Sequence, residues 1–187
     1  MNTGIIAQRY AEALLKLVLE NGSGERVLAQ EKILSKSLRS VPQMRRTLED
    51  YAVLDSQKMS VFASALSPEP LEPDLEKFLR LVLKKERVDY LIYIFSSFEN
   101  QWYSYNRILR GVLFVPRMDS EAEELARQAK DIILSHTGKK LELEVVVKPD
   151  LIGGFIIEVG DHLLDGSVRR QLDIIRRQFV VRNRRIV

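Results

Sequence analysis

Between residues 4 and 105 the sequence repeats hydrophobic residues at intervals of three or four, the spacing that predicts amphipathic α-helices. Turn-forming residues interrupt this pattern. The segment Asn21-Gly22-Ser23-Gly24 ends the first helix, and three prolines between positions 68 and 73 separate the fourth from the fifth. Asp74 is expected to cap the fifth helix. The six predicted helices cover about residues 4–20, 25–39, 42–50, 55–67, 74–85 and 88–105.

After Asn106 the pattern changes to short runs of alternating or β-branched residues, which predict strands. Strands are expected over residues 108–115, 141–147, 155–159 and 162–164, with helices over 119–137 and 167–179. Ser120 and Glu123 have the spacing of a capping box, and Gly138 is placed to end that helix. The sequence therefore predicts an α+β protein: a six-helix bundle in residues 1–106, followed by a small α/β domain in residues 107–187.

The first and fifth predicted helices are apolar around about 200° of their circumference, whereas packing against one core needs only about 100°. Two interpretations remain open. Both helices are central in the bundle and buried on two sides, or part of their surface binds an amphipathic helix of another protein.

Half of the fourteen aromatic residues lie between positions 90 and 105, in the sixth predicted helix. Aromatic side chains interleaved with basic ones can stack on nucleic-acid bases, but here Arg107 and Arg110 follow the cluster. Packing in the core is the better interpretation, with Tyr103 among the residues expected to be exposed.

The chain carries no recognisable catalytic motif. It contains no cysteine, which excludes disulfides, thiolate nucleophiles and Cys-ligated metals, and its two histidines lie in different segments. Phosphate-loop and dinucleotide motifs are absent, and His162 has no nucleophile elbow to act with. No apolar run reaches the roughly 18 residues of a membrane span. We expect no enzyme activity and no cofactor, and contact with a membrane only through partners.

The C-terminal end is basic, although the net charge of the 187 residues is only +3. A solvated helix face explains this pattern, and so does binding to an acidic protein, an acidic headgroup surface or nucleic acid. Between Ser167 and Val187, one acidic residue, Asp173, stands against Arg169, Arg170, Arg176, Arg177, Arg182, Arg184 and Arg185.

Two C-terminal segments resemble the signature of a known family. Residues 151–161 (LIGGFIIEVGD) and 164–172 (LDGSVRRQL) are similar to the C-terminal motif of the δ subunit family of F-type ATP synthases, which includes the mitochondrial oligomycin-sensitivity-conferring protein. Residues 7–14 (AQRYAEAL) resemble the opening of the same family. The resemblance covers the whole chain, with Glu158 and the Arg-rich end as departures.

The resemblance implies a non-catalytic stator subunit without cofactors. The helical bundle would hold the N-terminal helix of an α subunit in a groove between its first and fifth helices, and the C-terminal domain would hold the b subunits of the peripheral stalk. The complex would place the chain at the cytoplasmic face of a bacterial inner membrane. The alternative is a nucleic-acid-binding protein that uses the Arg-rich C-terminal helix, although no nucleic acid is expected as a partner of the stator.

The resemblance also assigns residues to these contacts. Those expected in the groove are Ile6, Tyr10, Ala13, Leu14, Leu17, Phe78, Leu79, Val82 and Leu83, of which some must face the bundle core instead. Those expected at the stalk are Arg169, Arg170, Arg176 and Arg177. A structural role is expected for Gly153, Gly154, Gly160, Asp161, Asp165, Gly166 and Ser167.

Overall fold

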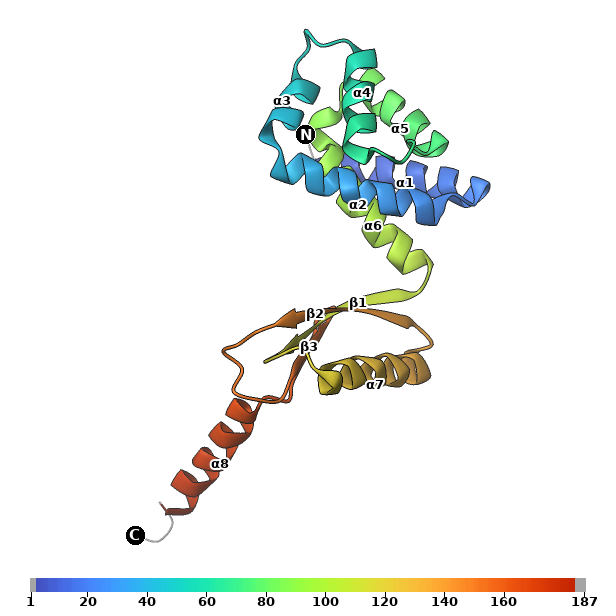
Figure 1. The fold of residues 1–187 in the computed structure, drawn as a ribbon. Coiled ribbons are helices and arrows are strands. Elements are labelled where there is room, and N and C mark those ends of the chain that lie inside the picture. The colour runs from blue at the N-terminus through green and yellow to red at the C-terminus, as the bar shows by residue number, and fades with distance from the viewer. Residues whose placement is uncertain (1–2, 184–187) are drawn as a thin grey trace. The chain divides into compact units, whose positions relative to one another are not determined.

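The computed structural model describes residues 3–183 of the chain, with side chains described as far as Arg177 (Figure 1). The chain forms two compact units, Met1–Trp102 and Tyr103–Val187. The first unit is helical, and the second holds a mixed four-stranded sheet with helices. The predicted α+β fold class is therefore confirmed.

Helices of the N-terminal unit follow the hydrophobic periodicity to within one or two residues. Only the sixth prediction is divided, because a short 3-10 turn, η1, precedes α6. The elements are α1 (Thr3–Asn21), α2 (Gly24–Ser40), α3 (Pro42–Glu49), α4 (Asp55–Leu66), α5 (Pro73–Lys84), η1 (Val88–Tyr90) and α6 (Leu91–Tyr105).

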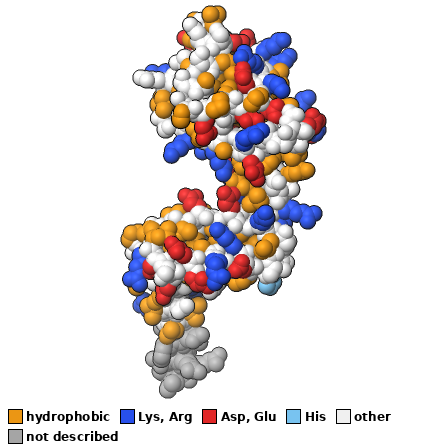
Figure 2. All heavy atoms as spheres, turned by 45° about the vertical axis from the view of Figure 1, so that its right-hand side comes forward, with side chains coloured by type: hydrophobic (Ala, Val, Ile, Leu, Met, Phe, Trp, Pro, Cys, Tyr) orange, Lys and Arg blue, Asp and Glu red, His pale blue; other side chains and the backbone are white. Residues whose placement is uncertain are grey.

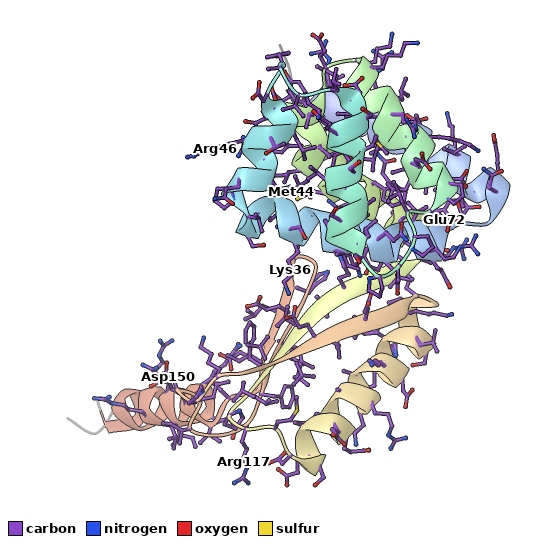
Figure 3. All side chains as sticks on the ribbon, turned by 45° about the horizontal axis from the view of Figure 1, so that its top comes forward. Lys36, Met44, Arg46, Glu72, Arg117 and Asp150 are labelled. Atoms are coloured by element: carbon purple, nitrogen blue, oxygen red, sulfur yellow. The ribbon has the colours of Figure 1, made fainter. Side chains whose placement is uncertain are left out.

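One hydrophobic core joins the helices of this unit. Leu14 of α1, Leu79 of α5 and Phe95 of α6 are fully buried in it. The short helix α3 shows how a polar sequence contributes: Met44 is buried, whereas Arg46 points away from the bundle (Figure 3). Proline at the first position of α3 suits that helix start, because its missing N–H has no partner there.

Two local expectations were wrong. Asp74 does not cap α5, because Glu72 holds the N-cap position and Pro73 begins the helix. Tyr103 is not exposed but buried, and the guanidinium of Arg110 lies 4.8 Å from the centre of its ring. Both residues are held by contacts with other segments of the chain.

The C-terminal unit consists of β1 (Ile108–Val115), α7 (Ser120–Thr137), β2 (Lys140–Val147), β3 (Ile156–Val159), β4 (His162–Asp165) and α8 (Val168–Asn183). The strand order is β2-β1-β3-β4. β1 and β2 are parallel, and the other two pairs are antiparallel. Parallel neighbours need a crossover connection, and α7 provides it.

The predicted end of α7 is confirmed at its C-terminus, but the predicted cap at its N-terminus is wrong. The N-cap is Asp119 rather than Ser120, and its Oδ1 accepts a hydrogen bond from the backbone N–H of Ala122 at 3.0 Å. Arg117, labelled in Figure 3, donates to the other oxygen of Asp119 at 2.7 Å. Gly138 follows the helix at φ +65°, as predicted, because a left-handed residue there strains any other side chain.

Helix α7 packs on one face of the sheet, mainly against β1 and β2. Ala122 and Ala126 of α7 share a buried cluster with Leu113 and Val115 of β1, and α7 also lies against β2. Register places Leu113, Ile157 and Leu164 on this same face, across β1, β3 and β4. Exposure rises along that row, because Leu113 is fully buried and Leu164 is 60% exposed.

Candidate partner-binding sites

The structure sorts the nine groove residues into core and surface. The five that are buried, and therefore belong to the bundle core, are Leu14, Phe78, Leu79, Val82 and Leu83. The three that are half-buried are Ile6, Tyr10 and Leu17, and Ala13 is exposed. Only these last four, all on α1, offer surface to a partner.

Contacts at two points hold α1 beside α5. The rings of Tyr10 and Phe78 meet edge to face, with centroids 6.5 Å apart. At the other end, Asp74 of α5 accepts hydrogen bonds from Nδ2 of Asn21 at 2.9 Å and from Oγ of Ser23 at 2.6 Å. The flank of α1 that carries Tyr10 therefore faces α5.

The four surface residues of α1 form one stripe along this flank. Ile6, Tyr10, Ala13 and Leu17 follow each other at steps of four, three and four residues, which aligns them on one helix face. Leu81 lies one turn after Phe78 on α5 and is 43% exposed. We call these five residues the α1–α5 surface. Leu81 was not among the predicted site residues, although its place three residues after Phe78 could have indicated it.

Asp74 fixes the end of this surface. The residue is 5% exposed, and Nζ of Lys77 lies 3.5 Å from its Oδ1. The pKa of Asp74 is lowered, and the hydrogen bond from Ser23 is the largest cause. Burial opposes this by raising the pKa, and Asn21 and Lys77 lower it further. The charged form is therefore the one that the α1–α2 turn binds.

The C-terminal motif brings two glycine-containing segments together. The N–H of Val168 donates to the carbonyl of Gly153 at 3.0 Å, and that of Gly166 donates to Phe155 at 2.9 Å. Gly154 has φ +79°, and a Cβ there would lie 2.3 Å from the carbonyl oxygen of Gly166. No other residue fits at that position.

The remaining motif residues shape the two ends of the β3–β4 hairpin. Gly160 and Asp161 form its turn. At the other end Oδ1 of Asp165 accepts from the N–H of Ser167 at 2.9 Å, and Oγ of Ser167 accepts from the N–H of Arg170 at 3.3 Å. Hydrogen bonds from Ser167 lower the pKa of Asp165. The motif thus determines where α8 begins.

The four arginines assigned to the stalk are exposed on α8: Arg169, Arg170, Arg176 and Arg177. Leu172 and Ile175 of the same helix are also about half exposed. The side chain of Arg182 and the residues Arg184 and Arg185, which complete the predicted basic tail, lie outside the described residues. Hydrophobic side chains are visible on the surface of both units in Figure 2.

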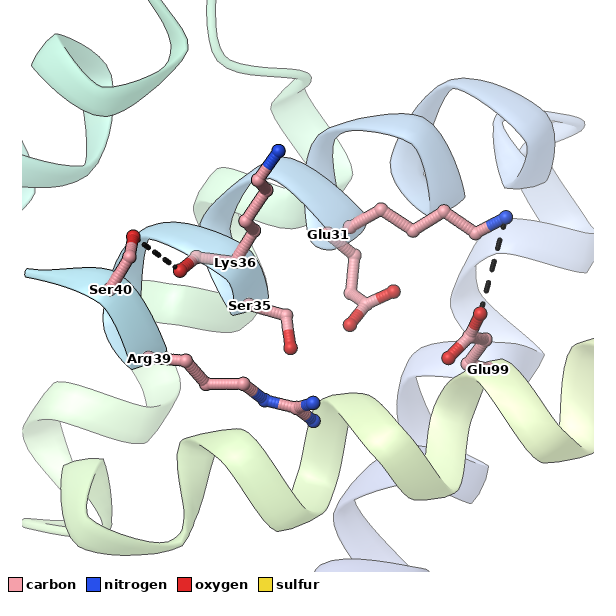
Figure 4. A pocket seen from close by; sticks show the side chains of 7 residues that line it. Glu31, Ser35, Lys36, Arg39, Ser40 and Glu99 are labelled. Carbon is pink, nitrogen blue, oxygen red and sulfur yellow. Dashed lines mark hydrogen bonds and ion pairs between the residues drawn. The ribbon is translucent and has the colours of Figure 1, made fainter. Parts of the chain in front are cut away.

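A polar hollow of about 410 Å³ lies between α2 and α6. Side chains of both charges line it, and Glu31, Ser35 and Arg39 point into it (Figure 4). Lys32 and Glu99 close one side as an ion pair at 4.0 Å. Three basic side chains and two acidic ones line it, so most of the charge is paired within the lining and no strong preference for an anion or a cation results.

Within the described residues we find no group of three side chains that could hold a metal ion. None of the described helices combines the length and the apolar character that crossing a bilayer requires.

Known proteins are similar to this chain over nearly its whole length. The model of the ATP synthase delta (OSCP) subunit family matches residues 6–179. The chain belongs to this family. ATP synthase subunit delta of Bacteroides fragilis is 35% identical over 191 residues, with both chains fully covered. The same subunit of Carboxydothermus hydrogenoformans is 32% identical over 183 residues, covering 96% of this chain and 99% of the relative.

A solved structure supports the fold. A chain of the Toxoplasma gondii mitochondrial ATP synthase hexamer superposes with a TM-score of 0.61 at 19% identity, covering 93% of this chain and 97% of that one. Family membership makes the protein a non-catalytic subunit of a bacterial-type ATP synthase, the stator component that links F1 to the peripheral stalk. The stator function expected from the sequence is therefore confirmed, and the alternative of a nucleic-acid-binding protein is not supported.

Proposed function

We propose that the α1–α5 surface binds the N-terminal helix of an α subunit, and that the C-terminal unit binds the b subunits of the peripheral stalk. The subunit would then lie at the cytoplasmic face of a bacterial inner membrane, held there only through the complex. The observation that carries the first contact is the stripe of Ile6, Tyr10, Ala13 and Leu17 beside α5.

The composition of the stripe suits a helical partner. Its side chains are spaced by three and four residues, so a second helix laid along α1 meets them in succession. Ala13 lies in the middle of the stripe and is small, which lets the backbone of a partner approach closely. Leu81 would close the other side of the contact from α5.

A stator must not dissociate while the rotor applies torque. Exposed ion pairs contribute about 0–1 kcal/mol each, whereas apolar anchors that become fully buried contribute about 1.5–3 kcal/mol. The half-buried side chains of Ile6, Tyr10 and Leu17 can still bury the rest of their surface. An apolar helix contact therefore supplies the slow dissociation that this function needs.

The test is isothermal titration of the full chain with a synthetic peptide of the N-terminal segment of its own organism's α subunit. Ile6→Asp and Ala13→Arg should each weaken binding by roughly tenfold or more, because both put a charged side chain into the contact. Ile5→Asp is the matched control: Ile5 is 56% exposed and lies about 100° around α1 from Ile6. It should change binding by less than about twofold.

Two results would count against the proposal. If the folded wild-type chain does not bind the peptide, the contact with the α subunit is wrong. If the three variants bind equally well, the contact exists but lies elsewhere. Charged substitutions of Leu14 or Val82 cannot serve as tests, because both side chains are buried in the core and such variants would unfold.

A further inference from the structure

The turn between α1 and α2 contains a sequence that favours a spontaneous reaction of its own side chain. Asn21 ends α1 and is followed by Gly22, and no other asparagine of the sequence precedes a glycine. Both residues are exposed, and a Cβ placed on Gly22 would meet no atom within 4 Å apart from those of its chain neighbours. The backbone nitrogen of Gly22 is therefore reached without the obstruction that a larger following residue gives.

The reaction is loss of the side-chain amide. Asparagine is a thermolabile residue, and it reacts most readily before glycine. The nitrogen of Gly22 gives up its proton and forms a bond to Cγ of Asn21, and Nδ2 leaves as ammonia, which yields a cyclic imide. Water then opens either carbonyl of the imide. The products are aspartate and isoaspartate, so in both cases a carboxylate replaces the amide, with water taken up and ammonia released.

The amide that this reaction removes holds the turn to α5. Nδ2 of Asn21 donates to Oδ1 of Asp74 at 2.9 Å, and Asp74 is only 5% exposed. A carboxylate at position 21 has no proton to donate, so two acceptors of like charge would face each other. Nζ of Lys77 lies 3.5 Å from the same oxygen of Asp74, but the lysine side chain is 68% exposed. Its charge is screened by water and offsets little of this repulsion.

The same hydrogen bond slows the reaction in the folded chain. Cγ of Asn21 meets the nitrogen of Gly22 only after Nδ2 has left Asp74, so the reaction starts from a state in which the end of α1 has opened. Helix ends open more readily than helix interiors. Once the amide is lost, the original contact cannot re-form, because its donor is gone. A brief opening is thereby made permanent.

We propose that Asn21 is a deamidation site whose conversion releases the α1–α2 turn from α5. The contact with Asp74 is one of the two that hold α1 beside α5, and the other is the edge-to-face pair of Tyr10 and Phe78. Conversion removes the first and leaves the second. The helical unit of an old copy is therefore less stable than that of a newly made one.

The first experiment measures the conversion itself. The full-length chain is incubated at mildly alkaline pH, and peptides that contain Asn21 or Asn106 are followed over time by mass spectrometry. Asn106 is the internal control, because it is also exposed but is followed by Arg107. Asn21 should convert about tenfold faster than Asn106 or more, since glycine leaves the attacking nitrogen open. Isoaspartate should appear together with aspartate at position 21, because only opening of an imide gives both.

The second experiment measures the consequence by urea unfolding, followed by the emission of Trp102. Asn21→Asp makes one of the two products and should lower the midpoint of unfolding further than Asn21→Ala, which removes the hydrogen bond without adding a charge. A carboxylate at the end of a helix is unfavourable by itself, so a double variant is needed. Asn21→Asp combined with Asp74→Asn places an amide opposite a carboxylate again. It should unfold at a higher midpoint than Asn21→Asp, although Asp74→Asn alone lowers the midpoint of the wild-type chain.

Each experiment can overturn the inference. Conversion of Asn21 that is no faster than that of Asn106 would show that position 21 is not a deamidation site. Aspartate without isoaspartate would show that Gly22 takes no part in the reaction. If Asn21→Asp unfolds at the same midpoint as Asn21→Ala, or if the double variant is no more stable than Asn21→Asp, conversion does not act through Asp74.

Discussion

Replacing Gly24 by alanine should destabilise the helical bundle, although helix propensity alone predicts a gain. Gly24 is the first residue of α2 and is buried. Alanine is favoured over glycine inside a helix by about 1 kcal/mol. However, a Cβ on Gly24 would lie 1.9 Å from Cη2 and 2.0 Å from Cζ3 of the Trp102 indole.

The magnitude follows from this overlap. Carbon atoms pack at about 3.5–4.0 Å, so the indole or the start of α2 must move by more than about 1.5 Å. Trp102 is only 9% exposed and its ring lies 6.4 Å from that of Phe98, centre to centre, which leaves it little freedom. Overpacking costs about 1–3 kcal/mol, and an overlap this large belongs in the upper part of that range, at about 2–3 kcal/mol. After the gain of about 1 kcal/mol from helix propensity, we expect a net loss of about 1–2 kcal/mol in the free energy of unfolding.

The assay is urea unfolding followed by tryptophan emission. Trp102 is the only tryptophan, so its emission reports directly on the contact with Gly24. Gly24→Ala should lower the midpoint of unfolding and change the emission of the folded state. The control is Glu25→Ala at the next, exposed position of α2, which should change neither by much.

A stabilised Gly24→Ala variant with unchanged emission would refute the reasoning. It would mean that the indole moves aside without cost and that helix propensity determines the stability at this position. A destabilised variant with unchanged emission would place the strain in α2 rather than at Trp102.

Two further substitutions test the Asp74 contacts and the C-terminal motif. Hydrogen bonds lower the pKa of Asp74 in the folded chain, so its stabilisation is complete above the unfolded value of about 3.9 and is lost as the pH falls through the folded value. Asp74→Asn should cost about 1–3 kcal/mol at pH 7 and make urea unfolding less sensitive to pH below about 4. Gly154→Ala should unfold the C-terminal unit, seen as lost β-sheet amide signals in NMR spectra. Gly138→Ala, also at positive φ but with no atom within 4 Å, should cost only about 1–2 kcal/mol; equal stability of these two glycine variants would show that the contact with Gly166 does not matter.

Local pattern was enough to predict the helices and strands, because periodicity is a property of neighbouring residues. The first strand was predicted at residues 108–115, as observed. The errors concern residues whose partners are distant in the sequence. Asp74 has the right type for a cap but binds Asn21 and Ser23, more than fifty residues away. Nothing in the local sequence around Tyr103 indicates that its ring is buried.

For the α1–α5 surface, the sequence predicted which two helices form it but not which of their residues are exposed. The apolar arc of α1 is wide enough to include both Leu14, which is buried, and Leu17, which is half-buried. Which of them faces the core depends on how α1 packs against α5, through Tyr10 and Phe78. The open apolar face of β3 and β4 was not predictable, because it results from the order of the strands in the sheet.

The uncovered half of the sheet couples stability to assembly. A subunit whose β3–β4 face is filled by a partner gains RT ln(1 + [L]/Kd) in stability over a free one, which is about 2.7 kcal/mol when the partner is at one hundred times its Kd. A copy made in excess of its partners lacks this gain and exposes Ile132 and Leu164 to solvent. Surplus copies are therefore the ones that proteases and chaperones encounter, because their apolar face stays exposed to solvent.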